Sequence, residues 1–245
     1  MTSQDVILAL KERASAERAA TSARFFKTDK GQYGEGDKFI GVNMPDTRAV
    51  CKKYKDLPKL EVQKLLDSKV HEHRMAGAII LTYQFAKADA AEREKIYQLY
   101  MKNVYAGRIN NWDLVDVTTP RIVGAYLIDK PRDVLTMLAK SQNLWQRRVA
   151  ILATFAFINR GESADAIAIA KILLHDKHDL IHKAVGWMLR EMGKRVDEKT
   201  LTSFLDTHAQ QMPRTMLRYS IERLSSKQKS HYMNIKPNKV TMVVE

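Results

Sequence analysis

The stretch Lys183–Leu189, KAVGWML, begins with a basic residue, continues with small residues and ends with apolar ones. The same order recurs at 74–81, 148–152 and 217–221, and the segment that begins at Trp112 falls in phase between the first two. The period is about 33 to 37 residues, which is typical of antiparallel helix pairs stacked as a solenoid. The small residues would let neighbouring helices approach each other closely.

The composition agrees with an all-α fold. The chain of 245 residues has only 10 Gly and 6 Pro, and it is rich in residues that favour helices. The repeats predict one domain over residues 1–230, which is long enough to bury a sizeable core. Residues 231–245 do not continue the repeat, and we interpret them as an extended or mobile C-terminal tail.

Glycine, proline and helix-capping residues predict where the helices begin and end. An amphipathic opening helix is expected to run from Val6 toward Phe25 and Phe26, and the glycine-rich segment 31–36 should end it as a loop. This loop is not a phosphate-binding P-loop, because no Gly-Lys-Ser/Thr follows it. Further helix starts are expected at Pro45, Pro58, Asp89, Pro131, Ser163 and Pro213.

The charge balance indicates an acidic partner. Lys and Arg number 41 against 28 Asp and Glu, which gives a formal net charge of +13. Nucleic acid, an acidic membrane surface and acidic proteins remain open as partners, and the spread of the basic residues favours a folded basic face. Cys51 is the only cysteine and has no evident base partner, so we interpret it as structural. The N-terminus lacks a signal peptide and no apolar run spans a membrane, so we expect a soluble cytoplasmic protein.

Asp116 is the central candidate for chemistry. Trp112 lies four residues before it, a spacing that places an indole and a carboxylate on one helical face. Pro120 removes the N–H that would bond to the Asp116 carbonyl, so the helix should kink or open there. From the residues alone, Asp116 is either a functional carboxylate or half of a structural ion pair. Asp113 is rotated off this face and is expected to cap or pair structurally.

Two tryptophans are candidates for contacts with sugars or bases. Trp112 stands in a polar setting, which is unusual for a core residue, whereas Trp187 lies between Val185 and Met188 and suits either role. Trp145 is expected in the core.

Four cations recur at matching repeat positions, where the second helix of each pair would line a concave wall. Recurrence on one wall favours phosphate contacts over solvated surface charge, and the guanidinium fork suits a phosphate. These cations are Arg147, Arg148, Lys183 and Arg190. His175, His178 and His182 have spacings that could hold a metal, but no cysteine or ligand-orienting motif supports one, so we predict no metal.

Four segments resemble the AlkD-like DNA alkylation repair glycosylases, which are built from HEAT-like repeats. They are 33–42 with Pro45 and Arg48, 112–116, 145–152 and 183–191, and the resemblance covers roughly residues 20 to 225. It implies a right-handed superhelical solenoid of antiparallel HEAT-like helix pairs with a concave basic groove.

The resemblance also implies an activity. It suggests a monomeric, monofunctional DNA glycosylase that removes cationic N3- and N7-alkylpurines from double-stranded DNA in base excision repair, without a base-flipping pocket. Asp116 would stabilise the oxocarbenium-like sugar, and Trp112 and Trp187 would cradle the deoxyribose. The four cations would hold phosphates, and no cofactor, metal or membrane is implied.

One departure from the family and two other functions remain open. Some members carry an N-terminal Tyr where this chain has Phe25 or Phe26, and Tyr33 is a candidate to replace its hydroxyl. The second function is a non-catalytic HEAT-like module that binds damaged or branched DNA. Retention of Trp112, Asp116 and Trp187 argues against it. A protein-binding scaffold is the third, and its groove would be less basic.

Overall fold

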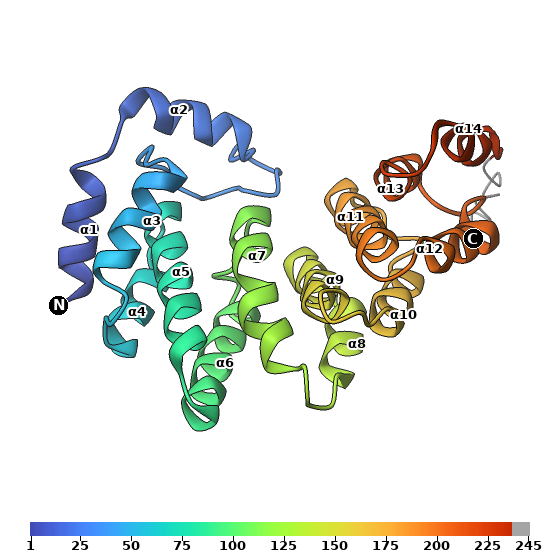
Figure 1. Cartoon of the computed structure of the whole chain (residues 1–245). Coiled ribbons are helices and arrows are strands. Elements are labelled where there is room, and N and C mark those ends of the chain that lie inside the picture. Colours follow the sequence, from blue (N-terminus) through green and yellow to red (C-terminus); the bar gives the residue numbers. More distant parts are fainter. Residues whose placement is uncertain (237–245) are drawn as a thin grey trace. The chain divides into compact units, whose positions relative to one another are not determined.

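The computed structural model describes residues 1–236, and all regular secondary structure in that range is helical (Figure 1). An isolated bridge between Lys38 and Val70 is the one β-type pairing found there. The all-α prediction is therefore confirmed. The helices are α1 Ser3–Lys11, α2 Ala16–Phe25, α3 Met44–Lys53, α4 Lys59–Leu66, α5 His71–Lys87, α6 Ala90–Tyr105, α7 Trp112–Thr119, the π-helical segment η1 Pro120–Gly124, α8 Asp133–Ala139, α9 Leu144–Ile158, α10 Ala164–Ile172, α11 Asp179–Arg195, α12 Glu198–His208, α13 Arg214–Ser220 and α14 Ser226–Asn234.

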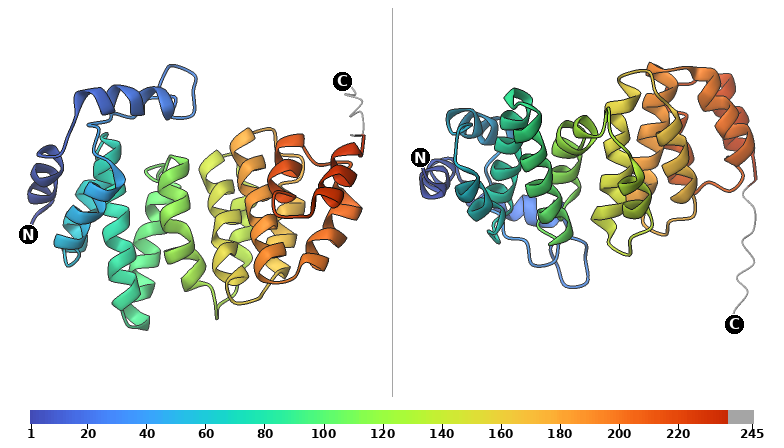
Figure 2. Two further views of the ribbon diagram at one scale, coloured as in Figure 1. Left: turned by 45° about the horizontal axis from the view of Figure 1, so that its top comes forward. Right: turned by 90° about the horizontal axis from the view of Figure 1, so that it is seen from below.

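The chain divides into two compact units, Met1–Tyr126 and Leu127–Glu245. In the first unit α3, α5 and α7 pack in succession, and in the second α9, α11 and α13 do the same (Figures 1 and 2). The four basic–small–apolar segments fall on α5, α9, α11 and α13, as the repeat predicted. The superhelical handedness and the single domain over 1–230 stay predictions.

Gly186 shows why small residues recur in these segments. A Cβ atom at this position of α11 would lie 2.5 Å from the Met216 carbonyl oxygen and 2.5 Å from the Tyr219 Cβ of α13. Both distances are far below van der Waals contact, so only glycine permits this close helix pair. The predicted reason for the small residues is confirmed here.

Most of the predicted helix starts are confirmed. Asn43 caps α3 with its side chain and Pro45 stands in the first turn. Asp89 caps α6 in the same way, accepting the Glu92 N–H at 2.8 Å. Pro58, Ser163 and Pro213 are the N-cap residues of α4, α10 and α13, whereas α8 begins at Asp133, two residues after the proline expected to start it.

The single opening helix was a wrong prediction, because the chain forms α1 and α2 instead. Ser15 interrupts it with an extended backbone, and its side chain accepts the Arg18 N–H to restart the helix. The Ser15 N–H donates to the Ile40 carbonyl oxygen at 3.0 Å, which ties this break to the segment after the glycine-rich loop. No residue of α2 is buried.

The predicted C-terminal tail begins later than expected. The C-terminal tail was expected from residue 231, but α14 continues to Asn234, so its first residues are helical. The rest of the tail prediction falls largely on residues 237–245, outside the described part. None of the helices in residues 1–236 is both long and apolar enough to cross a membrane.

Candidate active site

Helix α7 positions Trp112 and Asp116 one turn apart. The buried Asn111 caps the helix, and its side-chain oxygen accepts the Trp112 N–H at 2.9 Å. Both Trp112 and Asp116 are partly exposed. The α-helix ends at Thr119 and continues as the π-helical segment η1 from Pro120. The predicted opening of the helix is therefore confirmed, and it lies within one turn of Asp116.

A buried hydroxyl cluster supports the same end of α7. The Tyr100 hydroxyl lies 2.7 Å from the Thr118 hydroxyl and 3.0 Å from that of Thr119. Burial raises the pKa of Tyr100 to about 12, and the nearby Asp116 charge acts in the same direction. The phenol thus stays protonated and links α6 to the residues that precede the opened turn.

Aromatic rings back Trp112. Phe26 stacks on Trp112 with ring centroids 5.3 Å apart and on Phe39 at 5.1 Å. Phe25 meets Trp112 edge to face at 5.9 Å and is 63% exposed. Phe25 and Phe26 therefore both contact the indole. The Tyr33 hydroxyl lies 3.4 Å from the Phe25 carbonyl oxygen.

The glycine-rich loop connects Phe26 to Phe39 and brings their rings together. A Cβ atom at Gly34 would lie 2.3 Å from the Phe26 carbonyl oxygen, so glycine is needed where the loop closes. Beyond the loop, Glu72 of α5 accepts the N–H groups of Ile40 and Gly41 at 3.1 and 2.8 Å. The segment that carries Phe39 is thereby fixed to α5.

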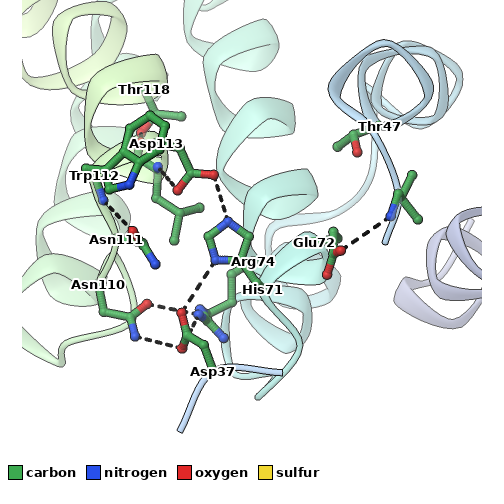
Figure 3. Close-up of polar contacts among 12 residues, drawn as sticks. Asp37, Thr47, His71, Glu72, Arg74, Asn110, Asn111, Trp112, Asp113 and Thr118 are labelled. Carbon is green, nitrogen blue, oxygen red and sulfur yellow. Dashed lines mark hydrogen bonds and ion pairs between the residues drawn. The ribbon is translucent and has the colours of Figure 1, made fainter. Parts of the chain in front are cut away.

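A buried charged cluster lies at the first turn of α7. We call Asp37, His71, Arg74, Asn110 and Asp113 the His71 node (Figure 3). His71 Nε2 lies 2.8 Å from an Asp113 oxygen, and Nδ1 lies 3.5 Å from Asp37, an ion-pair rather than a hydrogen-bond distance. Arg74 donates to Asp37 at 2.7 Å and to Asn110 at 2.9 Å. The prediction that Asp113 pairs structurally is confirmed.

The electrostatics favour a charged node. Burial works against the imidazolium, but Asp113 and Asp37 overcome it and raise the pKa of His71 to about 9. Burial likewise opposes the Asp37 carboxylate, yet His71, Arg74 and Asn110 together hold its pKa below the ordinary value. At neutral pH the node therefore contains an imidazolium between two carboxylates.

Trp187 and Arg190 lie on α11 in the second unit. Trp187 is partly exposed and its ring centroid lies 6.2 Å from that of Phe155. Arg190 donates to Glu191 at 3.1 Å and pairs with Glu222, leaving 18% of its side chain exposed. Burial opposes the Glu191 charge, but Arg195 and Arg190 lower the pKa of Glu191. Trp145, by contrast, is 7% exposed, as expected for a core residue.

The other three predicted phosphate-binding cations have protein partners in the same unit. Arg147 donates to Asp176 at 2.6 Å and to the Ser141 carbonyl oxygen at 3.0 Å. Arg148 is 4% exposed and donates to the Leu180 carbonyl oxygen. Lys183 pairs with Asp179 at 2.8 Å and keeps 40% of its side chain exposed.

The histidines near α11 serve the helix itself. His178 is its N-cap and accepts the Leu180 N–H, and His182 contacts the Asp176 carbonyl oxygen at 2.5 Å. In the described part of the chain, no group of three His, Cys, Asp or Glu side chains is arranged to hold a metal ion.

The structure thus brings Trp112 and Asp116 together on α7, and Trp187 and Arg190 together on α11. Sequence reasoning missed the His71 node and Phe39. His73, two residues after His71 on the same helix, lies outside the node and contacts Ser68 instead. The missed signal was four consecutive polar residues, 71–74, at the start of an apolar helix, all of them buried.

Comparisons with known proteins identify the family of the chain and a solved structure with the same fold. A family model described as "DNA alkylation repair enzyme" matches residues 6–224. A solved structure, a predicted DNA alkylation repair enzyme from Enterococcus faecalis, has the same fold with a TM-score of 0.68 and 15% sequence identity. The match covers 87% of this chain and 98% of that one. No curated protein is similar enough to count as a relative.

Proposed function

The chain belongs to the family of DNA alkylation repair enzymes, and on this premise we propose that it is a monofunctional glycosylase that excises cationic N3- and N7-alkylpurines from duplex DNA. It would act as a hydrolase in base excision repair. The observation that carries the proposal is the placement of Trp112 and Asp116 one turn apart, beside the helix opening at Pro120.

The chemistry needs one carboxylate. An alkylated purine already carries positive charge, so it leaves with the electrons of the glycosidic bond and needs no general acid. Asp116 would stabilise the oxocarbenium-like sugar and orient the water whose oxygen bonds to C1′. The proton that the water loses passes to the carboxylate or to solvent. No metal, cofactor or Schiff-base lysine takes part.

The aromatic and basic residues would hold the substrate. The indoles of Trp112 and Trp187 are partly exposed, and each would contact the deoxyribose or the backbone around the lesion, with an electron-rich face that favours positive charge. Arg147, Arg148, Lys183 and Arg190 would contact flanking phosphates. The net charge of +13 supports a polyanionic partner. We propose that the lesion is caught without a dedicated base pocket.

Release of free 7-methylguanine from methylated duplex DNA tests the activity. Wild-type protein should release the base and leave an abasic site, detected by mass spectrometry and by alkali cleavage of the strand. Asp129→Asn removes an exposed carboxylate outside the proposed site and should behave like wild type. Binding of duplex without release would overturn the glycosylase proposal in favour of a non-catalytic DNA-binding module.

A further inference from the structure

The His71 node flanks Trp112 through Asn110 and Asp113, yet the proposed reaction gives it no role. We propose that His71 and Asp113 are positioning residues that fix the first turn of α7, and with it Trp112, in the geometry needed for excision. The inference has two parts. The catalytic part, that this geometry speeds excision, rests on the proposed function. The mechanical part, that His71 governs the position of Trp112, does not depend on it.

The backbone on both sides of Trp112 is anchored to α5. Asp113 accepts the Leu114 N–H with one oxygen, at 2.8 Å, and contacts His71 with the other, also at 2.8 Å. Asn110 donates to Asp37 at 3.0 Å and accepts from Arg74 at 2.9 Å. Trp112 therefore stands between two residues whose side chains are both held by the node (Figure 3).

A second connection runs through the rings. The His71 ring stacks on Phe39 with centroids 4.6 Å apart and lies 5.2 Å from Phe26. Phe26 in turn stacks on Trp112. A displacement of the imidazole would thus reach the indole through the backbone of α7 and through the face of Phe26.

The node requires the charged form of His71. A neutral imidazole that donates to Asp113 would turn the lone pair of Nδ1 toward Asp37, whereas an imidazolium places an N–H and positive charge 3.5 Å from that carboxylate. The charged groups that face the ring are Asp37 from the segment after the loop, Arg74 from its own helix and Asp113 from α7. The His71 side chain is 3% exposed, so water cannot replace a lost partner.

Fluorescence of a variant with Trp112 as the sole tryptophan tests the mechanical part. Trp145→Phe with Trp187→Phe removes the other two of the three tryptophans. The Trp112 emission should change with pH along the same curve as the His71 ring resonances in NMR, with a midpoint near the His71 pKa of about 9. Adding His71→Gln should abolish this transition. Adding Asp113→Asn, which removes the strongest contact favouring the imidazolium, should lower the midpoint by about one pH unit or more.

His73→Gln is the matched control. His73 is also buried on α5, but its ring contacts Ser68 and lies outside the node. This variant should keep the Trp112 transition unchanged. If the His71 resonances titrate while the Trp112 emission stays constant, or if His73→Gln removes the transition as well, the positioning role is wrong.

Single-turnover excision of 7-methylguanine tests the catalytic part. Asp113→Asn, and His71→Gln/Asp113→Asn as a variant whose two amides replace the ion pair, should excise about tenfold to a hundredfold more slowly. Affinity for undamaged duplex should stay within about twofold, because the proposed phosphate contacts are unchanged. Excision at the wild-type rate would overturn the catalytic part. A wild-type protein without any excision would remove the proposed function and leave the fluorescence test decisive for the mechanical part.

Discussion

Phe26 stacks on Trp112 with an interplanar angle of 24°, so one face of the indole is supported by a residue far away in sequence. The ring of Phe26 also stacks on Phe39 at an angle of 11°. The tryptophan proposed to touch DNA is therefore not a freely rotating side chain. Its orientation depends on a phenylalanine at the end of α2.

Phe26→Ala should remove this support. We expect a loss of about 2 kcal/mol in the free energy of unfolding, since the ring is only partly buried. Single-turnover excision should fall by about tenfold or more because the indole is no longer held in place. Urea unfolding and single-turnover kinetics measure the two effects. Phe25→Ala, which truncates a ring that is 63% exposed, should cost less than about 1 kcal/mol; an equal loss in both variants would contradict the assigned support.

Asp116→Asn should lower single-turnover excision of 7-methylguanine by about a hundredfold or more, the usual scale for one electrostatic contact made in the transition state. Binding to intact duplex should not weaken, because a negative charge leaves the interface. Both quantities can be measured on the same labelled oligonucleotide. Normal excision by this variant would show that another acid carries the chemistry.

Excision should follow the charge of the lesion rather than its size. A pocket that encloses a flipped base selects by volume, and small misfits cost about 1–3 kcal/mol. Without such a pocket, cationic 7-methylguanine should be released far faster than neutral hypoxanthine, and a bulkier cationic N3-adduct should remain a substrate. Rates on three oligonucleotides provide the comparison. Efficient hypoxanthine release, or abrupt loss of activity as the cationic adduct grows, would contradict the proposal that the lesion is caught without a dedicated base pocket.

Lys183→Ala should weaken binding to all duplexes similarly and reduce the slope of log affinity against log salt by about one unit, as expected for one lost phosphate contact. Lys183 is the test of choice among the four cations because 40% of its side chain is exposed, whereas Arg148 is buried and its loss would also destabilise the fold. Titrations at several salt concentrations give the slope. Lys199→Ala, which truncates an exposed lysine on α12, serves as the control. Equal slopes for both variants would show that Lys183 is a solvated surface charge and makes no phosphate contact.

His71 should make stability depend on pH. Its folded pKa of about 9 lies above the ordinary value of 6.5, so the folded protein keeps a proton that the unfolded chain releases between these values. The contribution is complete below about pH 6.5 and is lost as the pH rises through about 9, which amounts to roughly 3 kcal/mol. Relative to His71→Gln/Asp113→Asn, the free energy of unfolding of the wild type should fall across this window in urea titrations. A difference that stays constant with pH would show that His71 is not charged in the fold.

The sequence predicted what depends on local periodicity. The basic–small–apolar segments became α5, α9, α11 and α13, and Pro120 opened the helix after α7 because a missing N–H acts on its own turn. The break at Ser15 was missed, although a serine followed by a helical stretch is a common cap. Its extended backbone is stabilised by the Ile40 carbonyl oxygen, a contact with no local signal.

The candidate site was predictable only in part, because contacts between residues far apart in sequence have no local signal. Trp112 and Asp116 share a face through simple helical spacing. Asp37 and His71, however, meet across the glycine-rich loop, and a single sequence contains nothing that pairs them. The buried state of Arg148 was equally hidden, because its acceptor is the carbonyl oxygen of Leu180 on another helix.

The helix that supports Trp112 has no buried residue of its own. Segments with few buried contacts open locally at low free energy, without unfolding the rest of the domain. We therefore expect the backbone amides of α2 to exchange with solvent more easily than those of the buried helix α5. A duplex held against Trp112 would slow that exchange, and some of the binding energy would be used to order the support behind the indole rather than to grip the DNA.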